Sequence, residues 1–315
     1  MPADSLTIPP PETHASAAVG DAGIADADKS SRTPHRFDRR KFLLGAGLAA
    51  AGMTIYPLEI ARHELDLVRK DIRLRRLPEA FHGFRVVQLS DIHLEEFTED
   101  FFLRYAVSRI NHLRPDMVLL TGDFVSDGPR NQRIARNAAY RCGEILSTLE
   151  CPLRFASLGN HDVNVGAAVV LEALSTNGIT TLVDQVVPIE RDGQRIWLSG
   201  LDDGTRWPNL DRGIPKYIDA PLLLMIHEPD VTDRIMRHPR SSSVDLIFSG
   251  HTHGGQVRIP FLPPLSLPPL GKKYVEGLFR FNETQLYVNR GLGTVEIPIR
   301  FNCPPEITEI TLQPA

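Results

Sequence analysis

The feature that most constrains the fold is a set of apolar runs, each of which ends abruptly in Asp, Asn or His. The runs are GFRVVQLSD, DMVLLTGD, LRFASLGNHD, APLLLMIHEPD and VDLIFSGHTH. Short continuous apolar runs bounded by polar residues are typical of strands buried on both faces. Segments with helical spacing separate the earlier runs, at residues 100–113, 131–149 and 166–178. Strands that alternate with helices predict a layered α/β domain.

Other segments extend this core. Residues 64–74 alternate partly with a period of two, and residues 195–203 read as a strand paired through the turn at 191–193. The C-terminal part reads as a hairpin followed by a last strand. The chain has 315 residues, of which 42% are hydrophobic, so it can bury a substantial core. We therefore expect a mixed core of one or two sheets within residues 61–315.

The N-terminal part differs in composition. Residues 1–36 are rich in Pro, Ala, Ser, Thr and Asp without periodicity, which predicts disorder. In residues 37–60, Arg39 and Arg40 precede an uncharged run from Phe42 to Leu58, and this pattern resembles a twin-arginine export signal. The run is long for a signal core and slightly short for a spanning helix, so we expect either cleavage or retention as a membrane anchor. The alternative is an amphipathic first helix of the domain.

Charge and cysteine content exclude several classes of protein. The formal net charge is −4, and no basic block is long enough to form a nucleic-acid platform. The three cysteines include no CxxC pair, which argues against a disulfide framework or a thiolate zinc site. Histidine, present 11 times, is the notable residue type.

The polar ends of the apolar runs predict a ligand site. In α/β sheets, ligands bind beyond the carboxyl ends of the strands, so neighbouring strands would bring these ends together. Residues two apart in extended chain point the same way, so Asp91 with His93, and His251 with His253, could each aim two side chains at one point. The glycines that follow His253 permit close approach of backbone or substrate.

The residue types favour a metal site. Carboxylate, imidazole and amide oxygen without thiolate suit Mn²⁺, Fe²⁺/³⁺ or Zn²⁺. Seven candidate ligands exceed the needs of one ion and suit two, if one carboxylate bridges; a pair of such ions is a clamp used for phosphoryl displacement. Taken singly, each candidate has an ordinary interpretation as a helix cap, loop histidine or turn residue. The candidate ligands are Asp91, His93, Asp123, Asn160, His227, His251 and His253.

The ordered set resembles the calcineurin-like metallophosphoesterase superfamily over about residues 85–260. The motifs are Asp-x-His, Gly-Asp, Gly-Asn-His-Asp, a single His, and Gly-His-Thr-His. Residues 254–260 and 289–307 further resemble the exported or membrane-associated bacterial phosphodiesterase branch. The resemblance implies an α/β/β/α fold, in which two mixed sheets pack as a sandwich flanked by helices. The stretch 122–128 lacks the arginine of the protein Ser/Thr phosphatase branch, which argues against that activity.

The resemblance also implies roles for individual residues. Asp91, His93 and His253 would hold one divalent ion, and Asp123 would bridge to the second. His161 would not be a ligand but would face the leaving group as a proton donor or phosphate contact. A neighbour must keep that imidazole protonated, and the sequence leaves both Asp127 and Asp162 as candidates. The ligands of the second ion would be Asn160, His227 and His251.

These observations predict a two-metal phosphodiesterase or pyrophosphatase, exported through the twin-arginine machinery to the periplasm or the outer face of the inner membrane. The preferred substrate is a lipid-linked diphosphate sugar or a phospholipid. The alternatives are a nuclease of the same superfamily and a non-catalytic metal-binding envelope protein. The uncharged, proline-rich stretch within 259–274 is either a lip for a lipid substrate or a loop packed on the domain's own surface.

Overall fold

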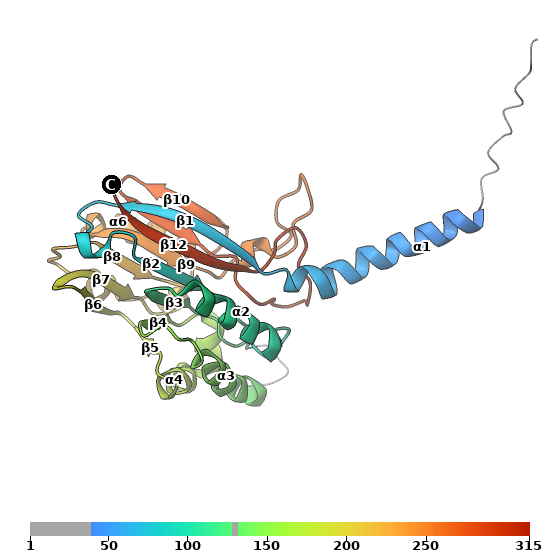
Figure 1. The fold of residues 1–315 in the computed structure, drawn as a ribbon, viewed down its shortest axis with the longest axis horizontal. Coiled ribbons are helices and arrows are strands. Elements are labelled where there is room, and N and C mark those ends of the chain that lie inside the picture. Colours follow the sequence, from blue (N-terminus) through green and yellow to red (C-terminus); the bar gives the residue numbers. More distant parts are fainter. Residues whose placement is uncertain (1–38, 128–131) are drawn as a thin grey trace, which may run out of the picture. The chain divides into compact units, whose positions relative to one another are not determined.

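The computed structural model describes residues 39–127 and 132–315, so the predicted disordered tail, residues 1–36, lies outside the described residues. The chain divides into two compact units, Met1–Ala46 and Gly47–Ala315. All strands of the described residues belong to the second unit, which is shown in Figure 1.

One sheet has six strands in the order β1-β12-β2-β3-β4-β5. The strands β2 to β5 run parallel to one another, β12 runs antiparallel to β2, and β1 runs parallel to β12. This sheet is therefore mixed, as predicted. Its strands are β1 (Asp66–Leu74), β2 (Arg85–Leu89), β3 (Met117–Thr121), β4 (Arg154–Ser157), β5 (Thr180–Thr181) and β12 (Glu306–Pro314).

The other six strands form a second mixed sheet in the order β10-β11-β9-β8-β7-β6. Its central strands β11, β9, β8 and β7 are parallel, and an antiparallel strand pairs with each side of this group. The predicted hairpins are β6 with β7 and β10 with β11. The strands are β6 (Gln185–Arg191), β7 (Gln194–Gly200), β8 (Leu222–Met225), β9 (Val244–Ser249), β10 (Gly277–Phe281) and β11 (Thr284–Val288).

The alternation of side chains along each strand builds the layers. In β2, Val86 faces a core shared with the second sheet, and its neighbour Val87 faces a core shared with helices. Leu103 of α2 (Asp100–Leu113) belongs to that helical core, together with residues of α3 (Gln132–Leu146) and α4 (Asn160–Thr176).

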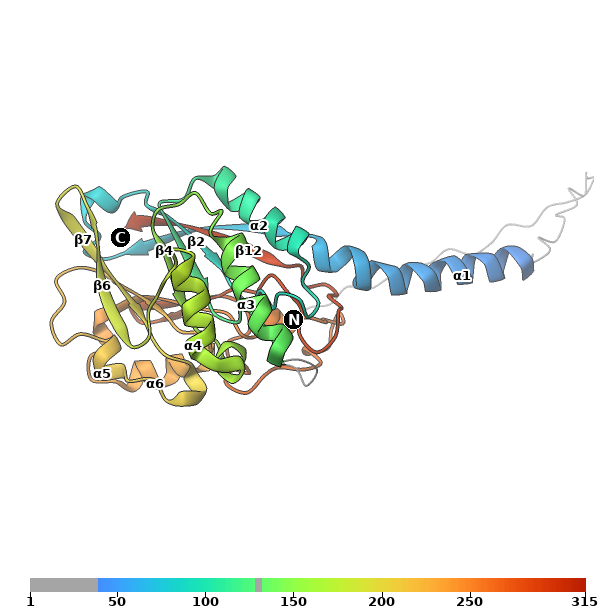
Figure 2. The same cartoon turned by 90° about the horizontal axis from the view of Figure 1, so that it is seen from below.

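A third core covers the outer face of the second sheet with α5 (Leu210–Gly213) and α6 (Thr232–Arg237). Figure 2 shows α5 and α6 away from α2. The predicted α/β/β/α sandwich is confirmed.

The helix predicted over 166–178 begins earlier, at Asn160, and ends at Thr176. Gly166, where the predicted helix begins, lies inside the observed helix with a φ of 127°. The glycine therefore kinks the helix. The additional first turn carries the Asn-His-Asp motif. The motif is therefore held on the helix that follows β4.

The helix α1 (Arg39–Ile55) coincides with most of the predicted export segment. Its described apolar side chains are solvent-exposed, including Leu43, Leu44 and Leu48. Within residues 39–127 and 132–315, no helix combines the length and apolar composition needed to cross a membrane. Nothing in the helix distinguishes an export signal from another apolar segment, so the twin-arginine interpretation remains a prediction.

Candidate metal centre

Five of the seven candidate ligands lie where the chain leaves a strand, and their backbones have positive φ angles. The prediction that Asp91-x-His93 and His251-x-His253 are extended is wrong. A positive φ is costly for residues other than glycine and survives only where the surroundings fix it. Here the loops fix one another: the amides of Asp91 and His93 donate to the carbonyls of Gly122 and Asp123, each at 3.0 Å. The φ values are 49° for Asp91, 49° for His93, 56° for Asp123, 73° for His251 and 50° for His253.

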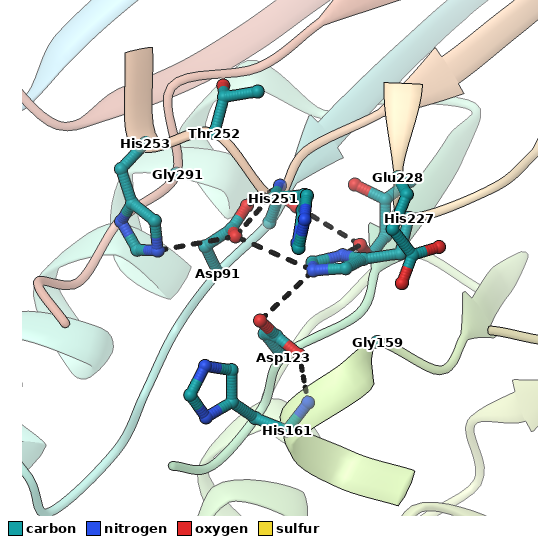
Figure 3. A network of polar contacts seen from close by, with 12 residues as sticks. Asp91, Asp123, Gly159, His161, His227, Glu228, His251, Thr252, His253 and Gly291 are labelled. Atoms are coloured by element: carbon teal, nitrogen blue, oxygen red, sulfur yellow. Dashed lines mark hydrogen bonds and ion pairs between the residues drawn. The ribbon is translucent and has the colours of Figure 1, made fainter. Parts of the chain in front are cut away.

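The turned backbones bring six of the seven candidate ligands together in two groups, several members of which are labelled in Figure 3. One group consists of Asp91, His93 and His253, and within it one potential ligand atom from each residue lies within 4.8 Å of the others. The second group, with the same spread, consists of Asp123, His227 and His251. A further cluster of this spread, His93 with Asp123 and His161, overlaps both groups. His251 and His253 thus serve different groups rather than one point. This is the division that the family resemblance implies.

Asp123 lies between the two groups. Its Oδ2 is 3.0 Å from Nε2 of His227 and 3.6 Å from Nε2 of His93. Burial opposes ionisation of this carboxyl, but the charges of His227 and His161 and a hydrogen bond from His227 together outweigh burial and hold the pKa of Asp123 well below its usual range. Asp123 is therefore an ionised carboxylate that lies between the two groups.

Each of the four clustered histidines has one ring nitrogen occupied by a partner outside the two groups. The carbonyls of Thr121 and Gly293 accept from Nδ1 of His227 at 2.6 Å and of His253 at 3.3 Å. Nε2 of His251 donates to the Pro269 carbonyl at 2.7 Å, and Nδ1 of His93 lies 2.8 Å from Oγ of Ser126. The three carbonyls hold a proton on the ring nitrogen that they contact, so the other nitrogen faces the clustered side chains, as in metal-binding histidines.

The imidazoles of the first group, His93 and His253, lie close together. Burial lowers the pKa of His93 to about 3 and the pKa of His253 well below its usual value, so both rings are neutral. Their Nε2 atoms nevertheless face each other at 3.1 Å. Two neutral imidazole nitrogens this close either share a hydrogen bond or both bind a neighbouring cation.

Asn160 provides a further test of fit. Its Oδ1 atom is buried and has no hydrogen-bond partner among the described residues. A buried amide oxygen without a partner costs about 1–3 kcal/mol, so such atoms usually have a ligand. The amide sits at the start of α4, directly before His161. A divalent cation within reach of this oxygen would satisfy it.

His161 is paired with Asp127. Its Nδ1 lies 2.5 Å from Oδ1 of Asp127, whose Oδ2 accepts from Nδ2 of Asn164 at 2.6 Å. Burial lowers the pKa of the His161 ring, but the charges of Asp123 and Asp127 outweigh it and raise the pKa to about 9. The ring is therefore protonated at neutral pH, with Nε2 free of this pairing.

Asp162, the other candidate partner of His161, binds backbone amides instead. Its carboxylate accepts from the amides of Asp123 at 2.8 Å, Phe124 at 2.9 Å and Gly159 at 3.0 Å. It thereby ties the turn after β3 to the start of α4. The structure thus selects Asp127 as the residue that holds the proton on His161.

The sequence pattern did not predict the contribution of Arg300. This side chain is fully buried and donates to the carbonyls of Gly291 at 3.1 Å and Gly293 at 2.6 Å. Gly291 packs so closely on Asp91 that an added Cβ would lie 2.6 Å from the Asp91 Cβ. Arg300 therefore stabilises the loop that packs on Asp91, and the Gly293 carbonyl of the same loop orients His253. A lone arginine in a C-terminal loop carries no sequence signal for that role.

Glu228 was also missed, although it directly follows His227. It is fully buried, and its Oε2 accepts from the amide of Gly204 at 2.7 Å. Burial raises the pKa of Glu228 well above its usual value. Its contact with Gly204 joins the loop after β7 to the residue beside His227.

Comparisons with known proteins agree with this geometry. The family model described as calcineurin-like phosphoesterase matches residues 84–255. The metallophosphoesterase YkuE of Bacillus subtilis (strain 168) is 33% identical over 88% of this chain and 98% of its own length. The phosphodiesterase YaeI of Escherichia coli (strain K12) is 33% identical over 73% and 82%, respectively. UDP-2,3-diacylglucosamine pyrophosphatase LpxG of Chlamydia muridarum (strain MoPn / Nigg) is 28% identical over 84% and 94%.

The matched region begins just before β2 and ends just after His253, so it contains every candidate ligand. Clustered histidine and aspartate side chains at the strand ends indicate divalent metal ions, and the family indicates hydrolysis of phosphoester bonds. The chain belongs to the calcineurin-like phosphoesterase family and is a phosphoester hydrolase.

Proposed function

We propose that this protein is a two-metal phosphodiesterase or pyrophosphatase that acts at the outer face of the inner membrane on a lipid-linked substrate. The observation that carries the two-metal part is the position of Asp123. An ionised carboxylate lies between two separate groups of imidazoles, within 3.0 Å of one and 3.6 Å of the other. One bridging carboxylate between two ligand sets is the arrangement that two neighbouring cations need.

In this proposal Asp91, His93 and His253 hold the first ion, and Asp123 serves both. The second ion also takes Asn160, His227 and His251. When bound, the ions supply Lewis-acid chemistry, which neutralises phosphoryl oxygens and makes water more acidic. The fit rests on the fixed histidine tautomers and on the unpartnered Asn160 oxygen.

His161 provides the proton for the leaving group. Asp127 holds Nδ1 and keeps the ring charged, so Nε2 carries a proton that can be given to a departing alkoxide or phosphate oxygen. Asn164 in turn holds Asp127, which limits rotation of the carboxylate. A positioned acid of this kind contributes typically about 10²–10⁴-fold to rate.

Two relatives support the substrate class. YaeI is named a phosphodiesterase, and the name of LpxG states that it cleaves a diphosphate in a diacylated sugar nucleotide. The arginine pair before the apolar run at residues 42–58 supports export of the folded, metal-loaded chain. The net charge of −4 does not favour a nucleic-acid substrate.

The test is metal analysis of the purified full chain together with hydrolysis of bis(p-nitrophenyl) phosphate and p-nitrophenyl phosphate in the presence of Mn²⁺. We expect about two ions per chain and a preference for the diester. Asp123→Ala should lose both, whereas Asp71→Ala, which removes an exposed carboxylate on β1, should lose neither. Preference for the monoester would contradict the diesterase proposal, and a chain without metal would contradict the two-metal centre.

A further inference from the structure

A group of exposed apolar side chains lies on two loops beside the metal centre. Phe261 is fully exposed, at 105% of its reference area, and Leu262 and Leu265 are 58% and 64% exposed. Residues 259–271 contain no charged side chain. These three side chains are therefore not packed on the domain's own surface, although other residues of the loop are half-buried. We call Ile259, Phe261, Leu262, Leu265 and the similarly exposed Ile297 the apolar tip.

The two loops that carry the apolar tip are joined to each other and to the segment 55–60 by backbone hydrogen bonds. The amide of Arg258 donates to the carbonyl of Phe301 at 2.9 Å, which joins the 259–265 loop to the 294–302 loop. Figure 1 shows these loops, in orange and red, next to each other. The second loop reaches the segment 55–60 through a bond from the amide of Arg300 to the Pro57 carbonyl at 3.2 Å. Ile55, Tyr56 and Ile60 in that segment are exposed as well.

We propose that the apolar tip inserts into the surface of a phospholipid bilayer, and this inference deepens the proposed function by giving the site its membrane orientation. The occupant follows from chain continuity: the segment 55–60 directly continues α1, whose Leu44 and Leu48 are also exposed. Separate apolar loop tips with an aromatic residue match a lipid surface, because a bilayer needs no shape complementarity. Tyr56 adds a side chain typical of the membrane–water interface.

The base of the same loop is attached to the metal centre. The Pro269 carbonyl accepts from Nε2 of His251 at 2.7 Å, and Thr252 donates to the Val275 carbonyl at 2.6 Å. Gly255 packs on Pro264, since a Cβ at Gly255 would lie 2.6 Å from the Pro264 Cβ. A bilayer that holds the loop tip therefore also fixes the height of the ligands, which favours phosphate groups at the lipid headgroup level.

The first experiment compares the full chain with Phe261→Ser/Leu262→Ser in sedimentation with vesicles of phosphatidylethanolamine and phosphatidylglycerol in a 3:1 ratio. The parent chain and the loop variant are each also made with Leu43→Ser/Leu44→Ser, so that vesicle binding through α1 does not mask binding through the loop. We expect the loop substitutions to lower the vesicle partition coefficient about 30-fold, from the apolar area that leaves the bilayer. Equal partitioning of parent and loop variant in that background would overturn the proposal.

The matched control is Tyr217→Ser. Tyr217 is 82% exposed but precedes β8, so it lies at the amino ends of the strands, away from the metal-centre loops. It should leave partitioning unchanged. Hydrolysis of bis(p-nitrophenyl) phosphate, a soluble ester, separates the two proposals: its absence in the parent would contradict the proposed activity, while vesicle binding would still test the apolar tip.

A second measurement places the tip within the bilayer. Phe261→Trp adds an aromatic reporter to a chain that has two native tryptophans. Vesicles containing lipids brominated on the acyl chains should quench the added emission, because bromine quenches only fluorophores that enter the hydrocarbon region. Emission equal to that in unbrominated vesicles would place the loop outside the bilayer and would refute insertion.

Discussion

Replacing Asp127 by Asn tests whether His161 is the acid of the reaction. Asparagine keeps an oxygen near Nδ1 of His161 but removes the charge that lies 2.5 Å away. A hydrogen bond to a charged partner contributes about 1.5–3 kcal/mol, which corresponds to roughly one to two pKa units. Burial and the charges of Asp123 and Asp127 together set the pKa of His161 to about 9. The variant pKa should therefore fall to about 7–8.

The sign of the effect on activity follows from the role. An acid acts in its protonated form, so activity declines as the pH rises through the pKa of His161. Asp127→Asn should move that alkaline limb about one to two pH units lower and reduce the rate at pH 8 more than at pH 6. The metal content should not change, because neither Asp127 nor His161 is a proposed ligand.

The assay is a pH profile of kcat for methyl aryl phosphodiesters whose leaving groups differ in basicity. A poor leaving group needs the proton and a good one does not, so His161→Ala should slow the poor substrates by about 10²–10⁴-fold and p-nitrophenyl esters much less. Asn164→Ala, which removes the contact to Asp127, should give a smaller shift of the same sign. An alkaline limb that is the same in parent and Asp127→Asn, or a loss of metal in His161→Ala, would refute the reasoning.

Three further substitutions follow from the contacts. Asp123→Ala should remove both ions and lower kcat/KM by at least about 10³-fold, because the bridge between the groups is lost; elemental analysis and kinetics check this. Asp162→Ala leaves buried amides without an acceptor and should lower the free energy of unfolding by about 3 kcal/mol in urea titrations. Arg300→Met should cost about 2–4 kcal/mol in the same titrations and weaken metal binding about 10-fold through His253.

Each of these variants has a matched comparison. Asp71→Ala removes an exposed carboxylate and should match the parent in metal content. Asp162→Asn keeps an acceptor oxygen and should be less destabilised than Asp162→Ala. Arg300→Lys should recover part of the metal affinity lost in Arg300→Met, because an amine can still donate to the loop carbonyls. Equal metal affinity in parent and Arg300→Met would show that the arginine supports the fold alone.

The strand layout was predictable because the strand cores are buried on both faces. In β2, Val86 and Val87 face different cores, and such strands read as continuous apolar runs rather than alternating ones. The polar residues at the strand ends were recognisable in the sequence because each of them directly follows a continuous apolar run. Family resemblance then supplied the division of the candidate ligands into two sets, and the structure brings together the members of these sets other than Asn160.

The orientation of the ligands was not predictable. The partners that fix His227, His251 and His253 are backbone carbonyls, which exist at every position and leave no pattern in the sequence. The positive φ values of the ligand residues have the same origin, since they depend on contacts between loops distant in the chain. The sequence also could not decide whether Asp127 or Asp162 is the partner of His161. In the structure His161 lies beside Asp127, whereas Asp162 accepts hydrogen bonds from backbone amides.

Removing the ions should lower stability without unfolding the chain. The four clustered histidines are each held by a carbonyl or hydroxyl that remains when the metal leaves. An ion present at about 100 times its Kd stabilises the folded state by about 2.7 kcal/mol, so two ions contribute about 5 kcal/mol. Chelation should therefore lower Tm and leave the far-ultraviolet circular dichroism at 25 °C unchanged. Loss of that signal would mean that the ligands are assembled by the metal, as in zinc fingers, and would contradict a centre built by the loops.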